Sequence, residues 1–550
     1  MAPCPLRIFS AAHDSQSRGT LASGGLACLP LAGASGHNEA VLPPAPTLAC
    51  RIGSVMDAFP LMSDHARWSR TKIVATVGPA SREPEQLAEL MRAGADVFRL
   101  NMAHGGPDVQ QENIDRIRAV SRDLVLPVAI LVDLAGPKFR LGEVAEDRVF
   151  CPAGETFYFV AGEPQAPNEF TSSYEPLLRE LSPGDTVMLA DGTVSMRVES
   201  RKKDRVAMTV LNQGVVRSRQ GINLPGVKLS APAISVDDHQ HALWAGKAGV
   251  DFVSLSFVRS PDEVRTLRDI VRSTGSKAGI IAKIEKQEAL ERLPEIVRES
   301  DGIMVARGDL GVEIDVARMP IEQKRVIRTC QEFHKPVIIA TQMLDSMHES
   351  PRPTRAEATD VANAILDGAD ACMLSGETAI GKYPREAVDM MNRIALATEE
   401  SMKGRPLRKL TEADDGLHMI TRGVVRGAGT IAQIVGAKLV VVASHSGRTA
   451  LALSQQRSFI PTIGVSTNES TLRKMCLYWG VTPLRGAPAT NLEQLIRHMD
   501  VWAAGAGLTK QGDSIVILGG SHLTAGPDDE EMAAGVHDIV VVHEVETATS

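Results

Sequence analysis

The chain has 550 residues, enough for roughly three to four domains of about 150 residues each, so a single small binding module is excluded. Hydrophobic residues make up 43%, which is typical of a globular protein, and the net charge of −8 disfavours bulk binding to nucleic acid or an anionic membrane. The seven cysteines are scattered and never spaced CxxC, which favours a reducing compartment over a disulfide framework, and no apolar run is long enough to predict a transmembrane helix.

Residues 1–65 differ in composition from the rest of the chain. They are rich in Ala, Gly, Ser and Pro, and up to Val55 the only acidic residues are Asp14 and Glu39. We interpret them as a disordered extension, or as a start assigned too early, with Met56 or Met62 as the true first residue. An acid-poor organellar targeting segment and a weak secretory signal are the alternatives. The expected location is therefore cytoplasmic, with organellar targeting left open.

From Arg70 onward, short β-branched runs alternate with helix-like stretches such as Glu85–Ala93, Asp262–Ser273 and Ile321–Phe333. Eight strand–helix units predict either an α/β barrel or a long doubly wound sheet. The runs are Lys72–Val77, Val97–Leu100, Val128–Val132, Phe252–Leu255, Gly279–Lys283, Gly302–Ala306, Val337–Ala340 and Ala371–Leu374.

Two further regions are predicted from the same kind of pattern. The interval between Val132 and Phe252 holds alternating runs at Asp185–Leu189 and Arg205–Leu211, which indicate a small all-β insertion. After Lys409 a new series begins, which we interpret as a separate α/β domain. It comprises a helix near Leu417–Val435 and strands at Leu439–Ala443, Thr462–Val465, Ser514–Leu518 and Ile539–Val542.

Polar side chains close or follow seven of the eight runs. In an α/β barrel all of them would meet at the carboxyl ends of the strands, where catalytic groups collect, so we expect an active site there. The structural alternative is a ring of ion pairs that closes the barrel. The residues are Arg99, Asn101, Asp133, Ser256, Phe257, Arg259, Lys283, Glu285, Arg307, Asp309, Thr341, Ser375 and Glu377.

The residue types at this mouth suggest two chemistries. Glu285 and Asp309 are oxygen ligands of the kind that Mg²⁺ prefers, and Arg99 and Lys283 suit phosphate and carboxylate oxygens. Together they would stabilise a phosphoryl group during transfer, or equally the enolate of a small keto acid, as in a metal-dependent aldolase. The residues alone leave both alternatives open.

Residues 70–545 resemble the pyruvate kinase family through an ordered set of short motifs. These are Ile73–Ser81 (IVATVGPAS), Arg99–Gly105 (RLNMAHG), Asp133–Arg140 (DLAGPKFR), Lys283–Glu285 (KIE), Met304–Ile314 (MVARGDLGVEI), Ala340–Met347 (ATQMLDSM), Pro351–Ala358 (PRPTRAEA) and Met373–Thr378 (MLSGET). The resemblance implies phosphoryl transfer from phosphoenolpyruvate to ADP, which gives pyruvate and ATP in the last step of glycolysis.

The resemblance also implies a fold and a domain organisation. We expect a (β/α)8 TIM barrel at residues 66–136 and 232–408, an inserted small β-barrel lid domain at 137–231 and a C-terminal α/β regulatory domain at 409–550. The family is usually homotetrameric, so a homotetramer is expected, with no nucleic acid or membrane partner.

The resemblance assigns roles to the charged residues of the mouth. Lys283 would bridge the phosphoryl group during transfer, and Arg99 would clamp it. Glu285 and Asp309 would hold Mg²⁺ or Mn²⁺. Arg99 and Arg140 would contact the nucleotide.

Two further roles follow from the same resemblance. Backbone amides around Gly308 and Asp309 would accept the substrate carboxylate at a helix N-terminus. Thr341 would lie beside the methylene carbon that takes a proton once the enolate is released.

The monovalent-cation site departs from the family pattern. Asn101, Asp133 and Leu134 match it, but Ala103 replaces a serine hydroxyl and Lys138 stands where potassium-dependent members have glutamate. We expect the Lys138 ammonium to replace the ion, with Asn101 and Asp133 as its contacts, so that K⁺ is not required.

Two other segments bear on ligands. Gln220 stands where the family usually has a lysine of the nucleotide grip, and Arg219 is the expected substitute. The loop Ser444–Thr449 resembles the family's effector loop, and its groups would cradle one phosphate of a phosphorylated effector, while the acidic run Asp528–Glu531 would repel a second. The predicted cradle consists of Ser444, Ser446, Gly447, Arg448 and Thr449; an ordinary strand–helix turn is the alternative.

Three function classes therefore remain to be compared. A phosphotransferase of the pyruvate kinase type is the leading hypothesis. A magnesium-dependent aldolase or lyase on a small keto acid is the second, and the inserted domain and the effector-like loop count against it. A non-catalytic sugar-phosphate sensor is the third; Gln220 favours it, and the intact set of Lys283, Arg99 and the two carboxylates disfavours it.

Overall fold

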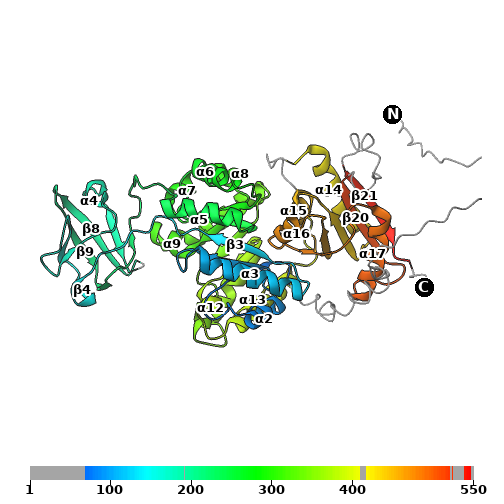
Figure 1. The fold of residues 1–550 in the computed structure, drawn as a ribbon, viewed down its shortest axis with the longest axis horizontal. Helices are drawn as coiled ribbons and strands as arrows, with labels where there is room; N and C mark the ends of the chain where they lie inside the picture. The colour runs from blue at the N-terminus through cyan, green and yellow to red at the C-terminus, as the bar shows by residue number, and fades with distance from the viewer. Residues whose placement is uncertain (1–68, 191, 409–416, 521–522, 524–537, 547–550) are drawn as a thin grey trace, which may run out of the picture. The chain divides into compact units, whose positions relative to one another are not determined.

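The computed structural model describes residues 69–190, 192–408, 417–520, 523 and 538–546 (Figure 1). The predictions for residues 1–65 and for the acidic run at 528–531 lie outside these ranges. Within them, no helix has the length and apolar character needed to cross a membrane.

Eight parallel strands close into a barrel, which decides between the barrel and the doubly wound sheet. Neighbouring strands follow chain order and β1 pairs with β16 to close the ring, with Lys72 opposite Ala371. The strands are β1 (Lys72–Thr76), β2 (Val97–Asn101), β3 (Ala129–Asp133), β12 (Phe252–Leu255), β13 (Gly279–Ile284), β14 (Gly302–Ala306), β15 (Val337–Ala340) and β16 (Ala371–Leu374).

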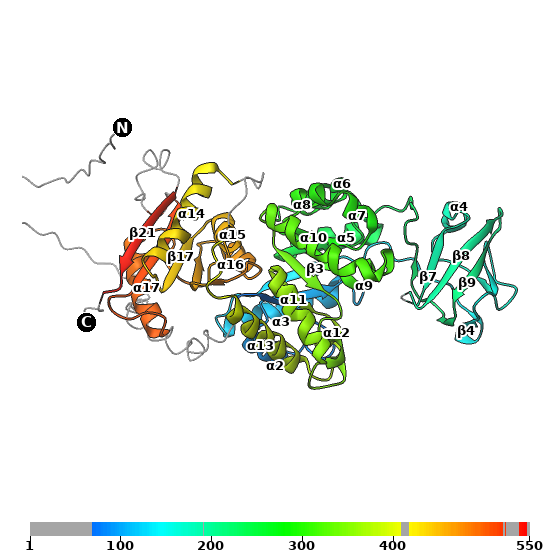
Figure 2. The ribbon, with the colours of Figure 1, turned by 180° about the vertical axis from the view of Figure 1, so that it is seen from behind.

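The sequence explains why the barrel helices begin and end where they do. Ser235, Ser260 and Thr354 each form a capping box, and Gly94 and Gly368 end helices in the left-handed conformation that glycine tolerates best. Figure 2 shows these helices on the outside of the strands. They are α2 (Pro84–Ala93), α3 (Pro107–Asp123), α5 (Val236–Lys247), α6 (Pro261–Arg272), α7 (Gln287–Glu291), α8 (Leu293–Glu299), α9 (Arg307–Glu313), α10 (Met319–Glu332), α11 (Arg355–Asp367), α12 (Gly376–Ala379) and α13 (Pro384–Met402), with 3₁₀ turns η3 (Val316–Arg318) and η4 (Asp345–His348).

The insertion between β3 and β12 is the predicted all-β region. A six-stranded sheet in the order β11-β7-β8-β9-β5-β6 and a two-stranded sheet of β10 and β4 enclose their own core, which includes Phe157, Phe159 and Phe170. The elements are η2 (Ala145–Asp147), β4 (Arg148–Cys151), β5 (Thr156–Val160), β6 (Glu169–Phe170), α4 (Leu177–Glu180), β7 (Thr186–Leu189), β8 (Val194–Arg201), β9 (Arg205–Asn212), β10 (Gly214–Arg217) and β11 (Ile222–Asn223).

The C-terminal region is the predicted α/β unit. Its five-stranded sheet has the order β19-β18-β17-β20-β21, parallel except for β21, which runs antiparallel to β20. The elements are α14 (Met419–Ile434), β17 (Leu439–Ala443), α15 (Arg448–Gln455), β18 (Thr462–Val465), α16 (Glu469–Met475), β19 (Val481–Pro483), α17 (Leu492–Gly505), β20 (Ser514–Gly520) and β21 (Asp538–Glu544).

Candidate active site

The carboxyl ends of the barrel strands surround a cavity of about 100 Å³. The barrel brings together most of the residues that the sequence placed at this mouth, from seven strand ends, but Arg259, Arg307 and Glu377 do not line the cavity. Arg99, Asn101, Asp133, Leu134, Lys138, Lys283, Glu285, Asp309, Thr341 and Ser375 all line the cavity, whereas Gly308 and Arg140 do not.

Lys283 is the central cation of the cavity. Its side chain leaves the end of β13, and the residue is only 8% exposed. The Nζ atom donates to Ser256 Oγ at 2.8 Å and lies 2.9 Å from Glu285 Oε1. Burial alone would lower the pKa of this ammonium, but the Asp133 and Glu285 carboxylates outweigh burial and hold the pKa above its ordinary range. Lys283 therefore remains charged near neutral pH.

Asp133 holds the two cations of the site together. At the end of β3, its carboxylate accepts from Arg99 Nε at 2.9 Å and from Ser254 Oγ at 2.6 Å, and it lies 3.4 Å from Lys283 Nζ. Burial by itself would raise the pKa of Asp133, but Lys283 and Arg99 reverse the sign and lower the pKa to about 2. The sequence predicted that Asp133 would contact Lys138. In the structure, the Asp133 carboxylate instead contacts Arg99, Ser254 and Lys283.

Glu285 is the buried carboxylate of the candidate metal pair. It is 1% exposed, and its Oε2 atom accepts from the Phe257 amide at 2.6 Å, while Oε1 accepts no well-directed hydrogen bond. Burial raises the pKa of Glu285 to about 7, and Lys283 opposes the shift. A cation bound beside this carboxylate would favour its ionised form.

Asp309 is the second candidate ligand and lies in the first turn of α9. Its half-buried carboxylate lines the cavity and forms no hydrogen bond or ion pair with the rest of the described chain. No group of three or more His, Cys, Asp or Glu side chains is arranged as a metal site within these residues. Two protein carboxylates fit a divalent ion such as Mg²⁺, which keeps several waters and takes substrate oxygens.

Thr341 and Gly308 contact each other directly. The Gly308 amide donates to Thr341 Oγ1 at 2.8 Å, and that hydroxyl donates to the Ala340 carbonyl at 2.7 Å. Thr341 has a φ of 71°, which is strained for a β-branched residue, and Arg307 Nη2 holds its carbonyl at 2.7 Å. The amide predicted to receive a substrate carboxylate is thus bonded to the Thr341 hydroxyl in this structure.

Lys138 lines the cavity but does not make the predicted contacts. Its side chain is exposed and forms no hydrogen bond or ion pair with the described residues. Asn101 Oδ1 instead accepts from the Ala103 amide at 3.1 Å, and Asp133 is already saturated by Arg99, Lys283 and Ser254. Lys138 therefore places its charge near the site without being tied to it.

The nucleotide-grip residues lie in the inserted region, outside the cavity at the barrel mouth. Arg140 is exposed and donates to the Arg219 carbonyl at 3.1 Å; it lines a second cavity of about 200 Å³ together with Lys138 and Asp309. Arg219, the expected substitute for the missing lysine, pairs with Glu143, and both side chains are mostly exposed. Gln220 uses its Oε1 atom to accept from the Arg217 amide.

The predicted phosphate loop follows β17 and leads into α15. Gly447 adopts a φ of 83°, its amide donates to Ser444 Oγ at 3.0 Å, and the Ser446 hydroxyl lies 3.5 Å from the Arg448 amide. The loop has the predicted strand–turn–helix geometry, which suits both a phosphate cradle and an ordinary capped turn.

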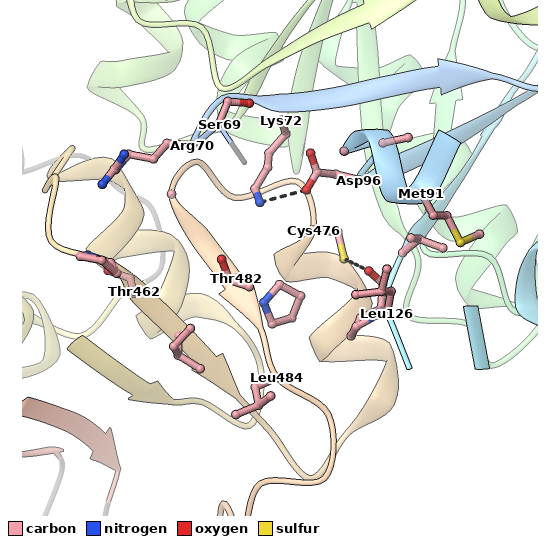
Figure 3. Close-up of a pocket in the computed structure, with 18 of the residues that line it drawn as sticks. Ser69, Arg70, Lys72, Met91, Asp96, Leu126, Thr462, Cys476, Thr482 and Leu484 are labelled. Atoms are coloured by element: carbon pink, nitrogen blue, oxygen red, sulfur yellow. Dashed lines mark hydrogen bonds and ion pairs between the residues drawn. The ribbon is translucent and has the colours of Figure 1, made fainter. Parts of the chain in front are cut away.

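A larger cavity, of about 340 Å³, lies at the amino ends of the barrel strands and not at the mouth (Figure 3). Its charged side chains are already paired: Lys72 lies 3.1 Å from Asp96, and Arg485 binds Glu469. The Cys476 thiol donates to the Pro127 carbonyl at 3.3 Å. The greater volume of this cavity does not make it the candidate site, because the partly unsaturated charges converge at the mouth.

Sequence comparisons agree with the geometry. The chain matches the family models described as pyruvate kinase, barrel domain, over residues 68–388 and pyruvate kinase, alpha/beta domain, over residues 422–529. The chain belongs to the pyruvate kinase family. It is 41% identical to a pyruvate kinase of Agrobacterium vitis over 82% of this chain and 93% of that protein, and 39% identical to one of Staphylococcus epidermidis over 82% and 77%.

Solved structures give the same result. A crystal structure of a pyruvate kinase from Cryptosporidium parvum superposes with a TM-score of 0.78 at 30% identity, covering 88% of this chain and 97% of that one. Family membership makes this chain an enzyme, a phosphotransferase of the pyruvate kinase type.

Proposed function

We propose that the barrel mouth transfers a phosphoryl group from phosphoenolpyruvate to ADP, with a divalent cation held by Glu285 and Asp309. The observation that carries this proposal is the Lys283 ammonium, which is kept charged by Asp133 and Glu285 yet faces a cavity also lined by Asp309 and Arg99. Charges fixed before the reaction need no reorganisation when the transferred group becomes more negative.

Each charged side chain has a distinct task in the transfer. Lys283 binds the phosphoryl oxygens as the bond to the enolate oxygen breaks. Arg99 of β2, oriented by Asp133 at the end of the adjacent strand β3, binds the same group. A divalent ion, Mg²⁺ or Mn²⁺, would supply charge neutralisation for phosphoryl and enolate oxygens. Arg99 and Arg140 contact the nucleotide phosphates.

The enolate left by the transfer must take a proton on its methylene carbon. Thr341 lines the same cavity, and its hydroxyl is fixed between the Gly308 amide and the Ala340 carbonyl. We assign Thr341 to this step as the residue that orients the water delivering the proton, with the backbone amides around Gly308 and Asp309 near the substrate carboxylate.

We further propose that catalysis does not require K⁺. Lys138 supplies a tethered ammonium at the cavity, and Ala103 lacks the hydroxyl that would bind the ion. A second cation about 4 Å from the ammonium would be repelled by about 1–4 kcal/mol, depending on the local dielectric.

The test is activity in tetramethylammonium buffer with and without KCl at matched ionic strength; stimulation by K⁺ of an order of magnitude would contradict the proposal. Lys138→Glu should lose activity without K⁺, and adding Ala103→Ser should restore it when K⁺ is present.

The proposal also covers the domain boundaries, the assembly, the location and the effector site. The domains run over residues 66–136 with 232–408, 137–231 and 409–550, and the enzyme works as a cytoplasmic homotetramer. A phosphorylated effector binds with one phosphate at the loop of Ser444, Ser446, Gly447, Arg448 and Thr449. The geometry of that loop supports this assignment, and an effector response that survives Arg448→Ala would contradict it.

The overall function is tested by a coupled pyruvate assay on the full chain with phosphoenolpyruvate, ADP and Mg²⁺. Pyruvate formation that depends on ADP is expected. Pyruvate released from a larger keto acid without phosphoenolpyruvate would indicate the aldolase class, and binding of phosphorylated ligands without any turnover would indicate a sensor.

A further inference from the structure

The loop that follows β15, the Thr341 loop, begins in a strained backbone conformation. Thr341 and Gln342 have φ values of 71° and 53°, so two consecutive residues with side chains adopt the left-handed conformation that favours glycine. Branching at Cβ makes this conformation especially unfavourable for threonine. A strained residue of this kind persists only where its surroundings hold it. Some neighbouring group must therefore hold Thr341.

The guanidinium group of Arg307 binds both carbonyls of this strained pair. Its Nη2 atom donates to the Thr341 carbonyl at 2.7 Å and to the Gln342 carbonyl at 3.3 Å, and its Nε atom donates to the Thr341 carbonyl at 3.3 Å. Arg307 is the first residue of α9, which follows β14, the neighbour of β15 in the barrel. The planar fork of donors in arginine suits two adjacent oxygens, so Arg307 ties the start of the Thr341 loop to the adjacent strand–helix unit.

A carboxylate from a third element orients Arg307. Asp360 of α11 accepts a hydrogen bond from Arg307 Nη1 at 2.5 Å. The Arg307 side chain is 12% exposed and that of Asp360 is 39% exposed. Neither residue lines the catalytic cavity. The pair can therefore act on the reaction only through the groups that it contacts, and the Thr341 backbone is the one that belongs to the cavity.

The other contacts of the Thr341 loop limit what Arg307 controls. The Thr341 hydroxyl accepts from the Gly308 amide at 2.8 Å, a contact that depends on the backbone angles of Thr341. Further along the loop, the Leu344 amide donates to the buried Glu377 carboxylate at 3.1 Å. This second anchor does not involve Arg307. Loss of the Arg307 contacts would thus release the two strained residues and leave the rest of the loop attached.

We propose that Arg307, oriented by Asp360, is a positioning residue that holds Thr341 in its left-handed conformation. The Thr341 hydroxyl is thereby kept where it orients the water that protonates the enolate. The alternative is a purely structural ion pair, which would affect stability without any selective effect on the proton step. The inference rests on the proposed function, because its effect appears in the step assigned to Thr341.

Exchange of the pyruvate methyl protons isolates this step. In D₂O with pyruvate, ATP and Mg²⁺, the proton step runs in reverse: a methyl C–H bond breaks, the proton passes to the oriented water, and the electron pair forms the enolate. A deuteron from the solvent then returns to the carbon, and ¹H NMR records the loss of the methyl signal, corrected for exchange without enzyme. Consumption of phosphoenolpyruvate with ADP and Mg²⁺ measures phosphoryl transfer in the same variants.

Arg307→Gln should slow methyl exchange by about tenfold or more, because a small displacement of a proton-transfer group is costly, but should slow phosphoenolpyruvate consumption by less than about threefold. The KM for phosphoenolpyruvate should stay near the wild-type value. Adding Gln342→Gly should raise the exchange rate again by about threefold, because glycine adopts the left-handed conformation without a steric penalty. Gln342→Gly alone should exchange at the wild-type rate.

The matched control is Arg268→Gln. Arg268, with a side chain 17% exposed, likewise binds one aspartate, Asp301, and one backbone carbonyl, but at the amino ends of the strands. Its loss should lower the melting temperature and leave the ratio of methyl exchange to phosphoenolpyruvate consumption unchanged. Asp360→Asn should lower this ratio by a smaller factor than Arg307→Gln, which keeps the test valid if Arg307→Gln fails to fold.

Two results would overturn the inference. One is a wild-type ratio in every folded variant of Arg307 and Asp360, and the other is a lowered ratio that the addition of Gln342→Gly leaves unchanged. A wild type that forms no pyruvate would instead contradict the proposed function.

Discussion

Both ends of the barrel carry buried charged residues, but the partners of these residues differ between the two ends. At the amino ends of the strands, a repeated arrangement joins neighbouring strands: an aspartate just before one strand accepts the amide at the start of the adjacent strand. The pairs are Asp96 with Ile73, Asp251 with Ile130, Asp301 with Ile280 and Asp370 with Val337, at 2.7–3.0 Å.

At the amino ends, cationic side chains form ion pairs with these aspartates. Arg118 and Arg473 bind Asp251, and Arg268 binds Asp301. Arg457 lies 3.1 Å from Asp370, and Lys72 lies 3.1 Å from Asp96. Each aspartate therefore contacts both backbone and a cationic side chain, which is the pattern of a structural contact. At the mouth, Asp309 has no such partner among the described residues, and Lys283, although paired with Glu285 and Asp133, also lines the cavity. Buried charge in a barrel thus indicates function only where its partners leave it unsaturated toward a cavity.

The largest effect should come from exchanging a lysine at each end for methionine. Lys283→Met removes a charge aligned with the transferred group and should lower kcat by about 10²–10³ with the fold intact. Lys72→Met, which removes an equally buried lysine paired with Asp96, should leave kcat near wild type and cost about 1–3 kcal/mol of unfolding free energy. Similar losses of kcat in both variants would remove the distinction between the ends.

The second comparison is between carboxylates at the mouth and a carboxylate at the amino ends of the strands. Glu285→Ala or Asp309→Ala should raise the Mg²⁺ concentration for half-maximal activity by about tenfold or more, because each removes one of two proposed protein ligands. Asp301→Ala at the opposite end should lower the melting temperature and leave the metal requirement unchanged. Metal titration curves that coincide for all three variants would mean that the ion binds elsewhere.

Asp133 connects stability to pH at the mouth. Its pKa is lowered from 3.8 to about 2 by Lys283 and Arg99, so the folded state favours the ionised form. The resulting stability, roughly 2 kcal/mol, is present above about pH 4 and is lost as the pH falls toward 2. Urea unfolding should show that Asp133→Asn destabilises the protein by about that amount at pH 7, and that the difference shrinks between pH 4 and pH 2. A difference independent of pH would contradict this electrostatic account.

Much of the fold follows from local sequence. The strands Phe252–Leu255, Gly302–Ala306, Val337–Ala340 and Ala371–Leu374 were predicted to the residue, because each is a short apolar run bounded by helix caps or polar turns. Closure of the barrel was not determined by such runs, since a doubly wound sheet has the same alternation of strands and helices. Closure depends on the pairing of β1 with β16, which lie at opposite ends of the barrel sequence. A local sequence pattern cannot predict such a long-range contact.

The candidate site, like the fold, could be predicted only in part from local sequence. Residues at strand ends could be placed at the mouth by topology alone, and Lys283, Glu285 and Asp309 do meet there. Their partners could not be predicted: Ser254 and Ser256 lie in or just after a buried strand, and only the register of β12 against β3 and β13 brings their hydroxyls to Asp133 and Lys283. The same dependence on register explains why Asp133 contacts Arg99 and Lys283 rather than Lys138.

The most direct test of the account is to follow phosphorus itself. In ³¹P NMR of the full-length protein with phosphoenolpyruvate, ADP and Mg²⁺, the phosphoenolpyruvate signal should decay while the γ-phosphate signal of ATP grows in equal amount, with Lys283→Met abolishing both changes. Loss of phosphoenolpyruvate with the phosphorus appearing as inorganic phosphate, or equal turnover in Lys283→Met, would contradict phosphoryl transfer at this site.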